Sequence, residues 1–260
     1  MFSSPALQGF VLSLAAGMAT ILGCVPVFVV SGKNERLLSA ALGLAAGVML
    51  SVSFMDLYPE AERLFGTVFS GRFSVLAAVG GLLAGILTAS FIDRFVPHEA
   101  YDQQTGEKPH KNLYRTSMLS VVVIGLHNFP EGIATFMAGY ENRILGISLA
   151  VAVALHNIPE GVAVAVPIYY ATRSKKKAVL YTALSGIAEP LGALSAFLLL
   201  YPFINDAVLG GVLAAVAGIM TYIAIEELIP SSRQYGYDQT ALWATFAGIS
   251  LMPLTRLFQF

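Results

Sequence analysis

The sequence predicts an all-α membrane protein, a polytopic bundle of eight transmembrane helices that forms one integral membrane domain over residues 1–260. Composition is the first reason: 56% of the residues are hydrophobic and 12% are charged, whereas soluble domains carry roughly 25% charged residues. The second is a series of long uncharged stretches, each able to cross a hydrocarbon layer about 30 Å thick. The third is that polar motifs recur inside these stretches in an inverted arrangement.

The apolar runs are continuous rather than alternating, which favours helices over a transmembrane barrel. They cover approximately residues 6–30, 37–58, 73–95, 116–139, 144–170, 178–201, 207–229 and 239–258. Turn and charge signals separate them, including a stretch from Pro59 to Arg72 that we interpret as a loop. The first run lacks a basic segment before it and is too long for a signal peptide, so we interpret it as an uncleaved first span.

The distribution of basic residues orients the helices. Most Lys and Arg residues lie in or beside the loops that follow odd-numbered spans, and positively charged loops stay in the cytoplasm. The loop at about residues 96–115 is therefore predicted to be cytoplasmic, and both termini are predicted to lie outside the cytoplasm, in a protein of the cytoplasmic (inner) membrane. The net charge of −1 gives no indication of nucleic-acid binding, and the single cysteine, Cys24, excludes a disulfide framework.

Two copies of one motif are the strongest chemical signal. Residues 126–132 read Leu-His-Asn-Phe-Pro-Glu-Gly, and residues 155–161 read Leu-His-Asn-Ile-Pro-Glu-Gly, on adjacent spans that must run antiparallel. Imidazole, carboxamide and carboxylate groups are all metal ligands, and burying them in hydrocarbon is costly unless something compensates. The alternative is that His and Glu only satisfy each other, but two copies with Pro and Gly favour a metal site.

Helical spacing divides the ligand groups into two compartments. His127 and Glu131 are four residues apart and Asn128 and Glu131 are three apart, so Glu131 lies between a His side and an Asn side of the fourth span. The fifth span repeats the pattern with His156, Asn157 and Glu160. Facing the two helices together predicts a His/Glu compartment suited to zinc and an Asn/Glu compartment suited to harder ions, which together make a central binuclear site.

Prolines and a further carboxylate extend this site. Pro130 and Pro159 are expected to kink the two helices and to leave free backbone acceptors in the bundle. Glu189, followed by Pro190 in an uncharged run, is assigned to the oxygen-rich compartment. The alternative for Glu189 is a pairing with a polar neighbour such as Ser185.

A second repeat relates spans two and seven. Gly47-x-Met49 and Asp56-Leu57-Tyr58-Pro59 recur as Gly218-x-Met220 and Glu227-Leu228-Ile229-Pro230, with a constant offset of 171. An even-numbered and an odd-numbered span cross the membrane in opposite directions, so this repeat is also inverted. The acidic residues at the ends of these spans, including Asp56 and Glu227, are candidate entrance residues that concentrate cations, or else ordinary solvated helix ends.

With these motifs the chain resembles the ZIP family of metal transporters over its whole length, and most closely the bacterial members. The resemblance implies uptake of Zn²⁺ into the cytoplasm through a binuclear site between spans four and five. One ion would take His127, Glu131, His156 and Glu160, with Met49 of span two as a further ligand that rests on the resemblance alone. The other would take Asn128, Glu131, Asn157, Glu160 and Glu189.

Both motifs carry His-Asn, so broad selectivity is expected, with Fe²⁺, Mn²⁺ and Co²⁺ as further substrates. The expected partners are these divalent ions and the lipid bilayer, with a homodimer as a further possibility, and no prosthetic group is expected. The competing function is an intramembrane zinc-dependent hydrolase. It is disfavoured because the sequence holds no His-Glu-x-x-His motif and no Ser or Cys nucleophile beside a base.

Overall fold

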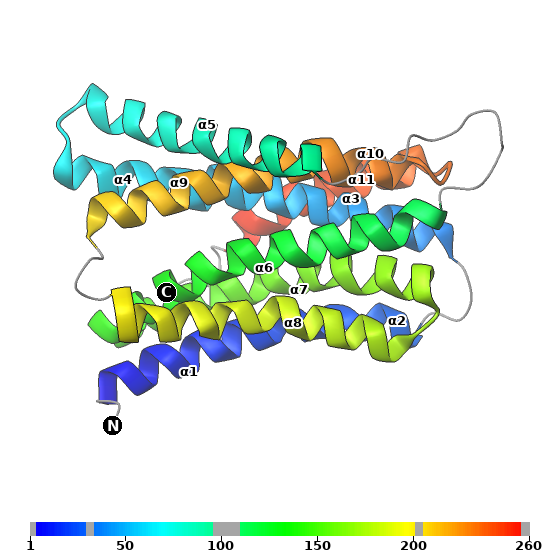
Figure 1. The fold of residues 1–260 in the computed structure, drawn as a ribbon, viewed down its shortest axis with the longest axis horizontal. Coiled ribbons are helices and arrows are strands. Elements are labelled where there is room, and N and C mark those ends of the chain that lie inside the picture. The colour runs from blue at the N-terminus through cyan, green and yellow to red at the C-terminus, as the bar shows by residue number, and fades with distance from the viewer. Residues whose placement is uncertain (1–3, 30–33, 96–109, 201–204, 256–260) are drawn as a thin grey trace.

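The computed structural model describes residues 4–29, 34–95, 110–200 and 205–255, and their regular elements form eight helical segments that run along one long axis in alternating directions (Figure 1). The α, 3₁₀ and π stretches that follow one another directly count as one segment. The segments are α1 (Ser4–Ala19) with η1 (Thr20–Cys24) and α2 (Val25–Val29); α3 (Glu35–Val52) with η2 (Ser53–Leu57) and α4 (Tyr58–Val68); α5 (Arg72–Phe95); α6 (His110–Glu141); α7 (Arg143–Thr172); α8 (Lys175–Ser195) with η3 (Ala196–Leu200); α9 (Asp206–Ile223) with η4 (Ala224–Leu228) and α10 (Ile229–Arg233); and α11 (Asp238–Thr255).

These segments confirm the prediction of an all-α membrane bundle. Among the described residues, six helices are long and apolar enough to cross a membrane: Pro5–Val29, Glu35–Val68, Arg72–Arg94, Gly146–Thr172, Lys175–Leu198 and Asp206–Arg233. The other two segments, α6 and α11, pack in the same bundle. Each of the eight predicted spans therefore coincides with one helical segment.

Several predicted boundaries are wrong. Span two continues beyond residue 58 as α4 and reaches Val68, so most of the predicted loop from Pro59 to Arg72 is helical. In the same way, span seven continues as α10 to Arg233. Proline did not end either helix because Pro59 and Pro230 occupy the first turn after a π segment, where the missing N–H has no regular helical partner.

The predicted cytoplasmic loop at 96–115 is also shorter than expected. Helix α6 begins at His110, so residues 110–115 belong to the helix. Residues 96–109 lie outside the described part of the chain. Between α6 and α7 the only non-helical residue is Asn142.

The helices divide into two groups that pack within themselves. In the first group, α1 contacts α6, α7 and α8, and η1 continues along α7 and α8. In the second, α3 packs against α11, and α9 packs against α4 and α5. The groups meet mainly where α3 lies against α7 and α6 lies against α9, and one large apolar cluster runs across this junction.

The structure bears out the repeat with an offset of 171. The π segments η2 and η4 begin at Ser53 and Ala224 and end at Leu57 and Leu228, which are equivalent positions under that offset. Figure 1 shows α3 and α4 running in the opposite direction to α9 and α10. Gly47 abuts the backbone of α11 at Thr245, and its counterpart Gly218 abuts the backbone of α5 at Leu82. The two halves of the second helix group therefore use the same close helix crossing.

The close packing of α5 against α9 predicts that alanine will affect stability differently at two glycines of α5. A Cβ at Gly85 would overlap the backbone carbonyl of Ala215, whereas a Cβ at Gly80 would meet nothing within 4 Å. Alanine stabilises a helix relative to glycine by about 1 kcal/mol, so Gly80→Ala is expected to leave the melting temperature of the detergent-solubilised protein unchanged or slightly raised. Gly85→Ala is expected to lower it clearly. Equal melting temperatures for the two variants would contradict the α5–α9 packing.

Candidate metal centre

Both copies of the motif lie in the middle of long helices. Residues 126–132 belong to α6 and residues 155–161 to α7, and both helices continue through Pro130 and Pro159 without interruption. The prolines therefore do not break either helix. Because α6 and α7 are antiparallel neighbours (Figure 1), the two motifs face each other at mid-length.

Glycines bring the helix backbones together around the motifs. Gly132 of α6 lies directly against the backbone of Glu189 in α8, and Gly192 of α8 lies against Phe129 of α6. On the other side, Gly161 of α7 abuts Thr20 of η1. At each of these glycines, a side chain with a Cβ atom would overlap a carbonyl oxygen of the neighbouring helix. Glycine is therefore required for the two helix backbones to come this close. These contacts hold α6 closely against α8, and α7 closely against η1.

A carboxylate and an imidazole meet across the α6–α7 interface. Glu131 Oε1 lies 3.2 Å from His156 Nε2. Glu131 is 3% exposed and His156 is 5% exposed, so the pair is shielded from the surroundings. The contact joins one residue of each motif across the helix interface. The side chain of His127 lies outside what the structure describes, so its predicted place in the His/Glu compartment stays a prediction.

A second polar contact joins α7 to α8. The amide nitrogen of Asn157 donates to Glu189 Oε2 at 2.8 Å and to the carbonyl oxygen of Ala16 at 3.0 Å. Both Asn157 and Glu189 are fully buried. Glu189 is therefore paired with Asn157 and not with Ser185, whose hydroxyl donates to Thr182 O. The assignment of Glu189 to an oxygen-rich metal position stays a prediction.

The second asparagine is held in a similar way. The amide nitrogen of Asn128 donates to the backbone oxygen of Ser185 at 3.2 Å. Because the nitrogen of each amide donates to a fixed acceptor, each amide oxygen points elsewhere. Among the described residues, Asn128 Oδ1, Asn157 Oδ1 and Glu189 Oε1 are buried and accept no hydrogen bond. Buried oxygens of this kind ordinarily have a partner, and hard cations are bound by such oxygens.

The electrostatics of the centre favour a cation. Glu131, Glu160 and Glu189 are at most 3% exposed, and all three interact electrostatically with His156. Every Lys and Arg whose side chain is described is exposed, so none of them enters the centre. One imidazolium cannot balance three carboxylates, and burying unbalanced charge is strongly unfavourable.

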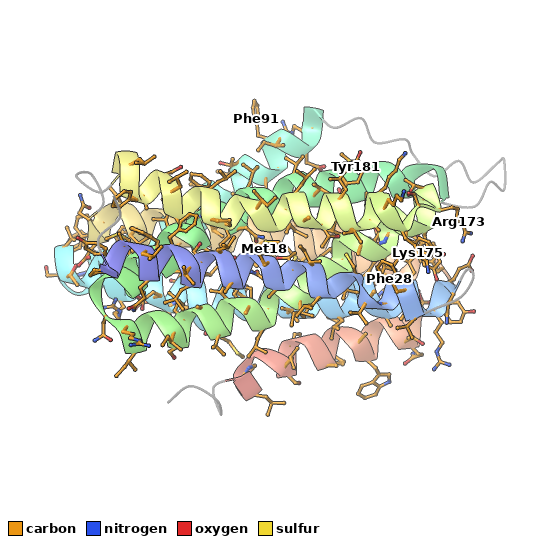
Figure 2. The ribbon with its side chains drawn as sticks, turned by 90° about the horizontal axis from the view of Figure 1, so that it is seen from below. Met18, Phe28, Phe91, Arg173, Lys175 and Tyr181 are labelled. Atoms are coloured by element: carbon orange, nitrogen blue, oxygen red, sulfur yellow. The ribbon has the colours of Figure 1, made fainter. Side chains whose placement is uncertain are left out.

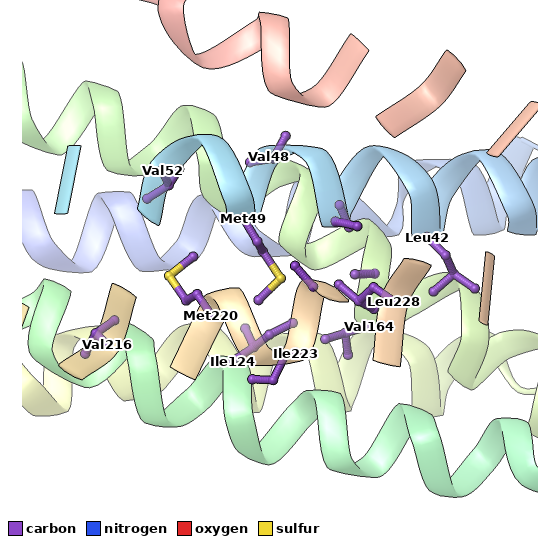
Figure 3. Packing of buried hydrophobic residues seen from close by; sticks show 14 of the residues in the cluster. Leu42, Val48, Met49, Val52, Ile124, Val164, Val216, Met220, Ile223 and Leu228 are labelled. Atoms are coloured by element: carbon purple, nitrogen blue, oxygen red, sulfur yellow. The ribbon is translucent and has the colours of Figure 1, made fainter. Parts of the chain in front are cut away.

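The remaining predicted site residues lie elsewhere in the helix bundle. Figure 3 shows Met49 of α3 with its sulfur beside Met220 of α9, near Ile124 and Ile223. Met49 is 1% exposed and belongs to the apolar cluster between the helix groups. No described contact joins it to the carboxylates, so its role as a ligand stays a prediction.

The candidate entrance residues lie in equivalent positions of the two π segments. Asp56 belongs to η2 and Glu227 to η4, and both are half-buried. Glu227 lines a cavity of about 30 Å³ with Asp93, Tyr222 and Leu126, the residue that precedes His127. Figure 1 places α4 and α10, which follow these π segments, at opposite ends of the bundle.

Sequence reasoning missed two features of the centre. It did not identify the first span as a wall, although Ala16 accepts a hydrogen bond from Asn157 and Gly17 lies against Glu189. The signal available was the set of small residues in α1. Sequence reasoning also gave no sign of the π segments.

Among the described side chains, which exclude His127, no three His, Cys, Asp or Glu groups are close enough to hold a metal ion together.

Comparison with known proteins gives a consistent result. The family described as "ZIP Zinc transporter" matches residues 98–256. The chain is similar to the protein named zinc transporter ZupT of Streptococcus mutans, at 40% identity over 254 residues, covering 95% of this chain and 96% of that protein. It is also similar to the ZupT proteins of Oceanobacillus iheyensis, at 41% identity with 96% and 97% covered, and of Chlorobium phaeovibrioides, at 45% identity with 95% and 96% covered.

The hydrogen bonds of Asn157 make a testable prediction about stability. Asn157→Ala removes the donor to Glu189 and to Ala16, leaving a fully buried carboxylate without its hydrogen bond. The loss is expected to destabilise the metal-free protein by about 1–3 kcal/mol, measured as a lower melting temperature in detergent. Gln239→Ala, at an exposed position of α11, serves as the control. An unchanged melting temperature for Asn157→Ala would contradict the described network.

Proposed function

The chain belongs to the ZIP zinc transporter family, and we propose that it carries Zn²⁺ across the cytoplasmic membrane into the cytoplasm through the polar centre between α6, α7 and α8. The observation that carries the proposal is the set of three buried carboxylates that interact electrostatically with His156, in an apolar bundle where every described Lys and Arg side chain is exposed. A divalent cation supplies the missing positive charge and repays the burial cost.

We assign the ligands to two neighbouring positions. One ion is bound by His127, Glu131, His156 and Glu160, with Met49 as a further candidate. The other is bound by Asn128, Glu131, Asn157, Glu160 and Glu189. The Glu131–His156 contact supports the first group and the Asn157–Glu189 contact supports the second. Glu131 and Glu160 are shared, because each has two oxygens and lies between a histidine and an asparagine in its helix.

The two positions differ in the ions they favour. Imidazole and carboxylate suit Zn²⁺, whereas amide and carboxylate oxygens suit harder ions. We therefore propose that Fe²⁺, Mn²⁺ and Co²⁺ are also transported. The buried amide oxygens of Asn128 and Asn157, which accept no hydrogen bond from the described residues, support an oxygen-rich position.

The proposed orientation follows from charge. Arg173 and Lys175 lie at one end of the bundle (Figure 2), and Arg173 begins the exposed basic stretch that includes Lys175, Lys176 and Lys177. We place this end in the cytoplasm, so the first described helix begins on the outer side. Asp56 and Glu227 are proposed to attract cations at opposite ends of the pathway. Assembly as a homodimer stays a prediction, which light scattering of the solubilised protein would test.

The main test is zinc entry into liposomes. Purified protein is reconstituted with a zinc-sensitive dye trapped inside, and Zn²⁺ is added outside. We expect a protein-dependent signal that falls at least roughly 100-fold when Glu131→Ala and Glu160→Ala are combined, since shared ligands are lost from both positions. Asp238→Ala, which removes an exposed carboxylate, is the control.

The outcome also separates the transporter from the intramembrane hydrolase. A transporter passes metal with no other substrate present, whereas a hydrolase requires a cleavable substrate and leaves the dye unchanged. A zinc signal absent from the wild-type protein, or undiminished in the double variant, would refute the proposal.

Glu189 gives a finer test of the two positions. The hydrogen bond of Glu189 is with Asn157 and not with His156. Glu189→Ala should therefore change the ability of Mn²⁺ and Fe²⁺ to compete with Zn²⁺ more than it lowers zinc flux. The measurement is zinc entry at increasing concentrations of the competitor. Complete loss of zinc entry in Glu189→Ala would contradict the division into two positions.

A further inference from the structure

Thr135 of α6 is a buried polar residue that the proposed ligand sets do not use. Its side chain is 0% exposed. Its hydroxyl oxygen has no hydrogen-bond partner in the part of the chain that the structure describes. A buried hydroxyl without a partner is uncommon and requires an explanation.

The buried hydroxyls of Ser39 and Thr182 also lack a hydrogen-bond partner among the described residues. Seven other helical hydroxyls, in contrast, donate to the carbonyl oxygen four residues earlier, at 2.7–2.9 Å. This bond is made by Ser53, Thr88, Thr172, Ser195, Thr221, Thr245 and Ser250. Thr135 has the same option, because Glu131 lies four residues earlier in a continuous helix, but its hydroxyl does not use it.

The position of Thr135 on α6 indicates which groups its side chain lies near. Thr135 lies one turn beyond Glu131, and on the helix surface it falls between the directions of Glu131 and Gly132. Glu131 faces His156 of α7, and Gly132 lies against Glu189 of α8. Side chains also lean toward the N-terminus of their helix, so Thr135 leans toward the Glu131 carboxylate.

Ser13 provides a useful contrast. It is also buried, and its hydroxyl also lacks a partner among the described residues. It lies one turn before Gly17, the glycine that meets Glu189. However, its side chain leans toward the start of α1, away from Gly17. The geometry therefore favours Thr135 over Ser13 as a member of the centre.

We propose that the hydroxyl oxygen of Thr135 is an additional ligand of the cation in the oxygen-rich position, beside Glu131, and that it favours hard divalent ions such as Mn²⁺ over Zn²⁺. This inference rests on the proposed metal centre. A neutral threonine hydroxyl binds Mg²⁺ in phosphate-binding loops, so the chemistry has precedent. Two ligands four residues apart on one helix face can hold the same ion, as paired histidines do in zinc enzymes.

The test is equilibrium binding of Mn²⁺ to the purified full chain in detergent, followed by the electron paramagnetic resonance signal of free Mn²⁺. Thr135→Val keeps the shape and removes the oxygen, and we expect it to raise the Kd for Mn²⁺ roughly tenfold and the Kd for Zn²⁺ by less. Thr135→Ser keeps the hydroxyl and should stay close to the wild type. Thr221→Val is the matched control, because the Thr221 hydroxyl is also buried but donates to Ala217 O.

A Thr135→Cys variant tests the proposal independently of any packing effect of valine. A sulfur ligand should shift the preference of the centre from Mn²⁺ toward Cd²⁺ and Zn²⁺. The proposal is overturned if Thr135→Val leaves Mn²⁺ binding unchanged, if Thr135→Ser weakens it as much as Thr135→Val, or if Thr135→Cys leaves the ratio of Cd²⁺ to Mn²⁺ affinity unchanged.

This experiment is independent of the transport assay. If the wild-type protein binds Mn²⁺ and the Thr135 variants change that binding, the ligand assignment holds even when no zinc enters liposomes, and only the proposed transport fails. If zinc enters liposomes and depends on Glu131 and Glu160 while the Thr135 variants bind like the wild type, only the Thr135 assignment fails.

Discussion

The cost of keeping carboxylates inside an apolar bundle governs the centre of this protein. The side chains of Glu131, Glu160 and Glu189 are almost completely buried. Burying a charge in a region of low dielectric constant costs several kcal/mol unless the charge is compensated. The described chain supplies one hydrogen bond from Asn157 to Glu189 and a contact between His156 and Glu131, but its described Lys and Arg side chains are all exposed. A mobile cation can therefore take the place of the protons that burial otherwise favours on these carboxylates.

Close packing of helix backbones makes this burial possible. Gly132, Gly161 and Gly192 each lie against a carbonyl of a neighbouring helix, which brings α1, α6, α7 and α8 close enough for their polar side chains to meet. The same principle acts in the other helix group, where Gly47 and Gly218 occupy equivalent positions in the inverted repeat. Small residues thus set both the positions of these polar side chains and the matching packing of the two repeated segments.

The sequence could predict the helices and the candidate ligands because both depend on local patterns. Apolar runs located all eight helical segments, and the spacing of His, Asn and Glu assigned them to common helix faces. It could not predict where the helices ended, because Pro59 and Pro230 are accommodated by π segments that have no clear sequence signal. It also named Ser185 as an alternative partner of Glu189, whereas the packing of α7 against α8 brings Asn157 there.

The sequence by itself determined that this is a helical membrane protein with a duplicated motif of His, Asn and Glu, because composition and helical periodicity can be read from the order of residues alone. Only the tertiary structure decided which groups face one another. The roles of Ala16 and of the amide oxygens of Asn128 and Asn157 depend on how helices distant in sequence cross. Those crossings depend on individual glycines at which two helix backbones come close together. The sequence shows where these glycines are, but it does not show which helices they bring together.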